Sequence, residues 1–127
     1  MKPKIVRAKS LKEYLTPEGC FIFENCGTST GNKKVSIARA RVEAGVSTGV
    51  HHLERVQEIY LITQGKGIVQ IGDLEPSEVT EGDVVIIPPG EPQRITNNGK
   101  CDLIFYCICS PAFTENCYNN DEAESLT

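Results

Sequence analysis

A chain of 127 residues with 39% hydrophobic side chains is long enough and apolar enough to build one domain around a continuous core, which excludes wholesale disorder. Its net charge of −4, without a cluster of basic residues, argues against nucleic-acid partners. No segment is apolar over the length of a transmembrane helix, and the first four residues lack the apolar run of a signal peptide, so we expect a cytoplasmic protein with no membrane partner.

Residues 1–33 are predicted to form an N-terminal extension. Within it, Ser10–Leu15 fits one amphipathic helical turn, with Ser10 as the N-cap and Glu13 completing a capping box. Cys20–Phe23 is apolar and rich in residues that favour sheets, which predicts an added strand.

Residues 34–112 are predicted to form an all-β barrel. They read as short strands separated by turn residues, which is the pattern of a sandwich or barrel. Gln64–Gly67 is interpreted as a hairpin loop between two of these strands. The predicted strands are Lys34–Val42, Gln57–Thr63, Ile68–Ile71, Val84–Ile87, Gln93–Thr96 and Leu103–Cys109.

Residues 113–127 are predicted to form an acidic, partly disordered tail. From Glu115 onward the tail carries four acids and few apolar residues, so we expect fraying or disorder in its last residues.

Six cysteines are present, but they include no Cys-x-x-Cys pair, and only two histidines could help them to form a zinc site. In a reducing compartment we expect free thiols, with Cys20, Cys107 and Cys109 buried as small apolar side chains. Cys117 lies in the polar tail and is expected to be exposed.

Two segments of the chain resemble the signature motifs of the cupin superfamily almost position for position. The first family motif reads Gly, five residues, His-x-His, three or four residues, Glu, six residues, Gly. The second reads Gly, five residues, Pro-x-Gly, two residues, His, three residues, Asn. The matching residues are Gly45, His51, Glu58 and Gly65 in the first segment, and Gly82, Pro88, Gly90 and Asn97 in the second. The resemblance implies the cupin fold, a jelly-roll or double-stranded β-helix barrel.

Two metal-ligand positions depart from the cupin pattern, because Leu53 replaces the second His and Gln93 replaces the third. The resemblance then implies His51, Glu58 and Gln93 as the remaining ligand positions in the barrel mouth. Strand periodicity agrees that residue 51 faces the same side as residue 53, while His52 faces the other way. Fe(II), Mn(II), Ni(II) and Zn(II) usually take two or three nitrogens in such open sites, so we expect at most one weakly bound divalent metal.

Two interpretations without a metal remain open. His51, Glu58 and Gln93 can hydrogen-bond to one another and to water, as buried polar groups require. Alternatively, Glu58 could have a raised pKa beside Leu53 and work with His51 as an acid–base pair. His51 and Glu58 are therefore the candidate catalytic residues.

The candidate substrate-binding residues are Gln93, Tyr60, Arg39 and Arg41. Tyr60 follows Glu58 on the same strand face, where it either offers its hydroxyl or serves as core. Arg39 and Arg41 share one strand face and would clamp an anionic substrate if that face pointed inward. A solvent-facing position is the favoured alternative for both arginines.

The predicted function is binding of a small polar or anionic metabolite in the barrel mouth. The alternative is a metal-dependent or His–Glu acid–base enzyme of the isomerase, epimerase or dioxygenase type, acting on a sugar or a keto or organic acid. Cupins host both classes, so the fold does not choose between them. We also expect a homodimer, because small jelly-roll barrels leave edge strands that need cover.

Overall fold

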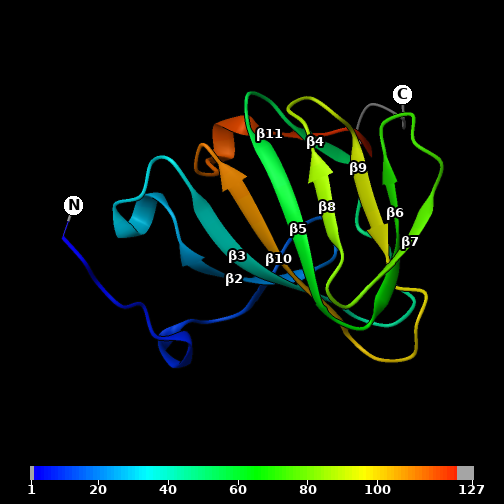
Figure 1. The fold of residues 1–127 in the computed structure, drawn as a ribbon, viewed down its shortest axis with the longest axis horizontal. Coiled ribbons are helices and arrows are strands. Elements are labelled where there is room, and N and C mark those ends of the chain that lie inside the picture. The colour runs from blue at the N-terminus through cyan, green and yellow to red at the C-terminus, as the bar shows by residue number, and fades with distance from the viewer. Residues whose placement is uncertain (1, 123–127) are drawn as a thin grey trace.

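The computed structural model describes residues 2–122 and consists of two antiparallel sheets that face each other (Figure 1). The strands are β1 (Tyr14–Leu15), β2 (Phe21–Cys26), β3 (Ser36–Val42), β4 (His51–Leu53), β5 (Gln57–Gln64), β6 (Lys66–Ile71), β7 (Ser77–Thr80), β8 (Val84–Ile87), β9 (Gln93–Thr96), β10 (Leu103–Ser110) and β11 (Tyr118–Asn120). Three short 3₁₀ helices are η1 (Ala8–Ser10), η2 (Thr28–Thr30) and η3 (Glu115–Cys117).

One sheet has the strand order β1-β2-β3-β10-β5-β8, and the other has the order β11-β4-β9-β6-β7. Chain neighbours such as β5 and β6 lie in different sheets, so the chain crosses repeatedly from one layer to the other. This arrangement is the jelly-roll or double-stranded β-helix fold that the sequence predicts. No helix in the described range 2–122 is long and apolar enough to span a membrane.

Buried and exposed side chains alternate along the strands, and the buried ones form the core between the two sheets. On β5, Glu58, Tyr60 and Ile62 are buried while their neighbours are more exposed. The same period of two places Ala40 and Val42 of β3 inside. β-branched and aromatic side chains fit this pleated, half-buried surface, which is why these segments form strands.

Gly65 is a crossing point between the sheets, and the predicted hairpin loop at Gln64–Gly67 is wrong. β5 pairs with β8 and β10, whereas β6 pairs with β7 and β9. Gly65 has φ +83°, and a Cβ there would lie 2.9 Å from the carbonyl oxygen of Asp102. The left-handed backbone and the close approach together require glycine.

The predicted helical turn at Ser10–Leu15 is also wrong. The 3₁₀ helix η1 ends at Ser10, whose hydroxyl donates back to the carbonyl of Arg7 at 2.7 Å. Glu13 forms no capping box, because its carboxylate pairs with Arg41 at 2.7 Å. The strand predicted at Cys20–Phe23 is confirmed as β2, which joins β3 in the first sheet.

The C-terminal segment joins the second sheet within the described residues. After η3, strand β11 pairs with β4 and becomes the edge of the second sheet. The expectation of an exposed Cys117 is wrong, because its side chain is only 4% exposed and packs with Leu53 and Val56. The expected fraying concerns residues 123–127, which lie outside the described residues.

Candidate functional site

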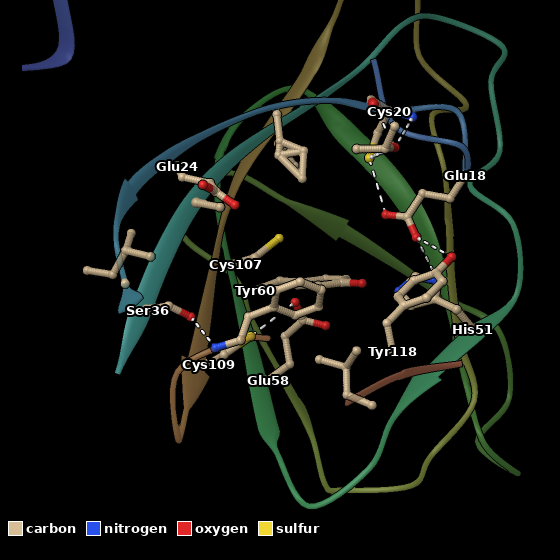
Figure 2. A pocket seen from close by; sticks show the side chains of 18 of the residues that line it. Glu18, Cys20, Glu24, Ser36, His51, Glu58, Tyr60, Cys107, Cys109 and Tyr118 are labelled. Carbon is tan, nitrogen blue, oxygen red and sulfur yellow. Dashed lines mark hydrogen bonds and ion pairs between the residues drawn. The ribbon is translucent and has the colours of Figure 1, made fainter. Parts of the chain in front are cut away.

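A cavity of about 470 Å³ lies between the inner faces of the two sheets. Its lining combines aliphatic and aromatic side chains with polar ones, and Figure 2 shows Glu18 and His51 on one side, Glu24 and Ser36 on the other, and Glu58 between them. The polar side chains that line it include Glu18, His51, Glu58, Tyr60 and Tyr118. They come from the N-terminal segment, β4, β5 and the C-terminal β11.

Glu58 projects from β5 into this cavity and is 7% exposed. Its Oε2 accepts a weak hydrogen bond from the Cys109 thiol at 3.6 Å. No hydrogen bond of standard geometry reaches its Oε1 within residues 2–122, while the Gln93 side chain interacts with this carboxyl and favours its charged form. Burial raises the pKa of the Glu58 carboxyl, and the nearby His51 ring only partly opposes that shift. A protonated Glu58 can therefore offer a proton to a molecule in the cavity.

His51 is buried and is oriented by contacts to its Nδ1. That nitrogen lies 2.9 Å from the carbonyl oxygen of Gly49 and 3.2 Å from Oε2 of Glu18. Because both partners are acceptors, we assign the ring hydrogen to Nδ1, which leaves a lone pair at Nε2 in the neutral ring. The Tyr118 ring stacks on the imidazole, with centroids 5.3 Å apart and an interplanar angle of 24°.

Glu18 is a site residue that the sequence did not reveal. Besides His51, it accepts hydrogen bonds from the Tyr118 hydroxyl at 3.3 Å and the Cys20 thiol at 3.4 Å. Figure 2 shows Glu18 between Cys20 and His51 at the edge of the cavity. Glu18 lies outside both motifs, and a single Glu in a Thr-Pro-Glu-Gly turn carries no signal of a functional role.

Tyr60 lines the cavity, whereas Gln93 lies behind it. The Tyr60 hydroxyl donates a hydrogen bond to Oε1 of Gln93, and both residues are buried. Burial raises the pKa of Tyr60 well above its ordinary value, so this hydroxyl remains a donor. Nε2 of Gln93 makes no hydrogen bond of standard geometry in the described part of the chain, but the Gln93 side chain also interacts with the Glu58 carboxyl. Gln93 thus fixes Tyr60 from the side away from the cavity.

Arg39 and Arg41 do not reach the cavity, so their predicted role as a substrate clamp does not agree with the structure. The alternation of β3 turns Ala38 and Ala40 inward and both arginines outward. The Arg39 guanidinium lies over the Phe23 ring, and that of Arg41 pairs with Glu13.

The residues present do not fit a divalent metal. Of the predicted ligands, the amide oxygen of Gln93 is occupied by Tyr60, and the set retains a single imidazole. Residues 2–122 contain no group of three or more His, Cys, Asp or Glu side chains that could hold an ion. Leu53, at a position where cupins carry a histidine, packs instead against Cys117 and Tyr118 of the C-terminal segment.

Four thiols also line the cavity, those of Cys20, Cys26, Cys107 and Cys109, and burial keeps three of them in the neutral form. Burial raises the pKa of Cys20 to about 12 and raises those of Cys107 and Cys109 further above their ordinary value. Cys20 and Cys109 are buried as expected, while Cys107 is half-buried against the cavity. Thiols rather than thiolates are poor nucleophiles, so these cysteines serve as weak donors and as packing.

The charge lining the cavity is acidic. Its described lining includes neither lysine nor arginine, but it does include Glu18, Glu24, Glu58 and Glu115. An anion placed among these carboxylates would find no cation other than a protonated His51.

Comparison with known proteins agrees with this architecture. A family model described as a cupin domain matches residues 38–109. Uncharacterized protein MJ1618 of Methanocaldococcus jannaschii is 33% identical over 126 residues, covering 97% of this chain and 96% of that protein. The oxalate-binding protein of Thermotoga maritima is 34% identical over 77 residues, covering 61% and 63%. Among solved structures, the nucleoside dehydratase Pac13 of Streptomyces superimposes with a TM-score of 0.76 at 16% identity, covering 94% of this chain and 91% of that one.

Proposed function

Because this chain belongs to the cupin family, we propose that its barrel cavity binds a small neutral metabolite and transfers protons on it, with Glu58 as the acid and His51 as the base. One observation carries the proposal: a buried carboxyl with a raised pKa faces the same cavity as an imidazole whose Nδ1 is held by two acceptors. A general acid must hold a proton and a general base must offer a lone pair; burial favours the protonated Glu58, and the Nδ1 contacts of His51 leave the lone pair of the neutral ring at Nε2.

The two groups can catalyse enolisation of a hydroxy-carbonyl compound. Nε2 of His51 takes the proton from the carbon beside the carbonyl, and the C–H electron pair becomes a C=C bond. The carbonyl π pair takes the proton of Glu58, giving a neutral enediol, an imidazolium and a carboxylate. The imidazolium then gives its proton to the former carbonyl carbon, and the Glu58 carboxylate takes the proton of the neighbouring hydroxyl as the new carbonyl forms. This completes an isomerisation and restores both side chains; protonation of the original carbon from the other face gives an epimerisation instead.

The acidic lining supports a neutral ligand over the anionic metabolite that the sequence left open. The T. maritima relative is named for oxalate, a dianion, but here a dianion would face several glutamates without a lysine or arginine among the described lining residues. The apolar wall suits a ligand with few charges, and the Tyr60 and Tyr118 rings offer it flat contact surfaces.

The test begins with binding. Thermal-shift screening of neutral aldoses, ketoses and nucleosides, with oxalate as the anionic comparison, should find neutral compounds that raise the melting temperature. Oxalate should leave it unchanged. Stabilisation by oxalate alone would contradict the ligand class.

The second stage measures proton transfer. Each stabilising compound is incubated with the protein in D₂O, and loss of its C–H signal is followed by ¹H NMR. Glu58→Gln should bind the compound but exchange it about 10²–10⁴-fold more slowly. Glu78→Gln, an exposed change of the same chemistry on β7, is the matched control. Binding without exchange by the wild type would instead favour a purely ligand-binding barrel.

A chelator distinguishes this proposal from metal catalysis. EDTA should alter neither the melting temperature nor the exchange rate, because the predicted ligand set does not fit a metal. The metal-free mechanism would be excluded if EDTA abolished the exchange and added Fe(II), Mn(II), Ni(II) or Zn(II) restored it.

A further inference from the structure

We infer that Glu18 is a positioning residue for His51, supplied by a part of the chain that precedes the matched cupin range. The inference rests on the proposed function, since it explains how His51 presents a basic Nε2. Glu18 lies 3.2 Å from Nδ1 of His51, although the two residues are far apart in the sequence. It is absent from the motif-derived set of His51, Glu58 and Gln93.

The contact selects one tautomer of the imidazole. The carbonyl of Gly49 and the carboxylate of Glu18 both accept from Nδ1, so a hydrogen at Nδ1 satisfies both, whereas a lone pair there would face two acceptors. A carboxylate also stabilises the imidazolium that forms when Nε2 takes a proton. This division of roles is the one that a carboxylate plays toward the histidine of hydrolase triads.

The backbone holds Glu18 in place for this role. The turn after Pro17 is closed by Thr16 N–H donating to the carbonyl of Cys20 at 2.8 Å. The carbonyl of Glu18 accepts from Gly49 N–H at 3.0 Å. Gly49 therefore binds Glu18 through its N–H and His51 through its carbonyl, which ties the N-terminal turn to the start of β4.

Side chains hold the Glu18 carboxylate as well. The Tyr118 hydroxyl donates to Oε2, and the Cys20 thiol donates to Oε1. Burial raises the pKa of Tyr118 to about 12, so its hydroxyl remains a donor at neutral pH. Tyr118 also stacks on His51, so one tyrosine from the C-terminal segment contacts both members of the pair.

The first test needs no substrate. ¹⁵N NMR of the imidazole nitrogens in the ligand-free protein reports which nitrogen carries the hydrogen when the ring is neutral. The wild type should show a protonated Nδ1 and an unprotonated Nε2 at His51. In Glu18→Gln the amide can donate to Nδ1, so the Nε2–H tautomer should become substantially populated. His52 provides an internal reference within the same spectrum.

The second test uses the D₂O exchange assay with whichever neutral compound the screen identifies. Glu18→Gln should slow exchange about 10–100-fold, the usual cost of losing an outer partner of a functional histidine. Glu18→Asp, which keeps the charge, should lose less. Tyr118→Phe removes one hydrogen bond to Glu18 and should shift both measurements in the same direction by a smaller amount. Glu78→Gln again serves as the control.

The outcomes are separable. A Glu18→Gln protein that keeps Nδ1–H and the wild-type exchange rate overturns the inference. A protein that loses exchange but keeps the tautomer also overturns it, because Glu18 would then act by another route. If Glu18→Gln changes the tautomer but the wild type exchanges no compound, Glu18 does orient His51, and the proposed catalytic function is wrong instead.

Discussion

Asn97 shows what one buried polar side chain does for this barrel. It is 0% exposed, and its Nδ2 donates to the carbonyls of Val42 and Cys101, both at 2.8 Å. Its Oδ1 accepts from Gly99 N–H at 2.9 Å. One amide thereby fixes the turn after β9 and connects it to the end of β3. Leaving a buried backbone group without a hydrogen-bond partner lowers the free energy of unfolding.

Asn97→Ala should therefore lower the free energy of unfolding by about 2 kcal/mol, because it strips a partner from the buried carbonyl of Val42 and from two part-buried backbone groups, the carbonyl of Cys101 and the N–H of Gly99. Urea unfolding followed by circular dichroism measures the change. Asn98→Ala, at the exposed neighbouring position, is the matched control and should stay within about 0.5 kcal/mol of the wild type. Equal effects of the two substitutions would contradict this account.

Glu58 should make stability depend on pH. Burial raises its pKa in the folded state above the ordinary value of 4.5. A group of this kind contributes its full stability below its unfolded pKa and loses that contribution as the pH rises through its folded pKa. Relative to the wild type, Glu58→Gln should thus become progressively more stable from pH 4.5 toward pH 8. Urea unfolding at several pH values measures this difference. The free energy of unfolding of Glu58→Gln, plotted against pH, should diverge from that of the wild type, while that of Glu78→Gln should run parallel to it. Parallel curves for Glu58→Gln would mean that its carboxyl is not desolvated.

At this scale the sequence predicts part of the pocket. The motif spacing and strand alternation place His51, Glu58 and Tyr60 at the cavity. Neither could find Glu18 or Tyr118, because their contact joins positions 100 residues apart and depends on how both chain ends fold back. Alternation alone also left open which face of β3 is inside, so the place of its arginines had to await the structure.

At the scale of elements, the C-terminal strand β11 forms one wall of the site. Its pairing with β4 aligns Tyr118 with Leu53 and Asn120 with His51. Beyond the strand, Asp121 lies 2.9 Å from Nδ1 of His52. The two neighbouring histidines thus have different roles: His51 faces the cavity, while His52 holds the tail.

The attachment of β11 should weaken as the pH rises. The hydrogen bond to Asp121 raises the pKa of His52, with a smaller contribution from Glu54. A raised folded pKa means that the stabilisation is complete below the unfolded value of 6.5 and is lost as the pH rises through the folded value. Amide hydrogen exchange in β11, corrected for the intrinsic rate, should show more protection at pH 6 than at pH 8.5. Asp121→Asn should abolish that difference, and the exposed change Asp73→Asn should not. Equal protection of the wild type at both pH values would count against the attachment.

The elements themselves were predictable to different degrees. Longer apolar strands such as β5 and β10 were found, since burial on one or both faces leaves a clear pattern. β7, β11 and β1 were missed because each is short and polar or isolated, and each becomes a strand by pairing with a neighbour rather than by its own preference.

At the scale of the whole molecule, the outer face of the first sheet is apolar across several strands. The register places Ile86 opposite Ile59 and Val84 opposite Leu61, and Tyr106 follows in the same row. Val84 and Ile86 are 54% and 63% exposed, and they lie on β8, the edge strand of this sheet. An apolar face that continues to an open edge favours association. We propose that the expected homodimer forms by two copies of the chain packing through this face.

Ile86→Glu should therefore give a monomer in analytical ultracentrifugation at micromolar concentration, while the wild type sediments as a dimer. A charge at the centre of a symmetric interface is buried twice, which makes the disruption strong. Leu74→Glu changes another highly exposed apolar residue, in the connection between β6 and β7, and should leave the dimer intact. A monomeric wild type, or equal effects of both substitutions, would exclude this interface.

The packing of Leu53 has a consequence for any attempt to build a metal centre in this barrel. The side chain at the position where cupins carry a metal-binding histidine packs with the segment that brings Tyr118 onto His51. Leu53→His would give up that packing while still lacking a third imidazole at position 93. The variant would have neither a competent metal centre nor a well-seated C-terminal segment, so a metal site would require changes at both positions together.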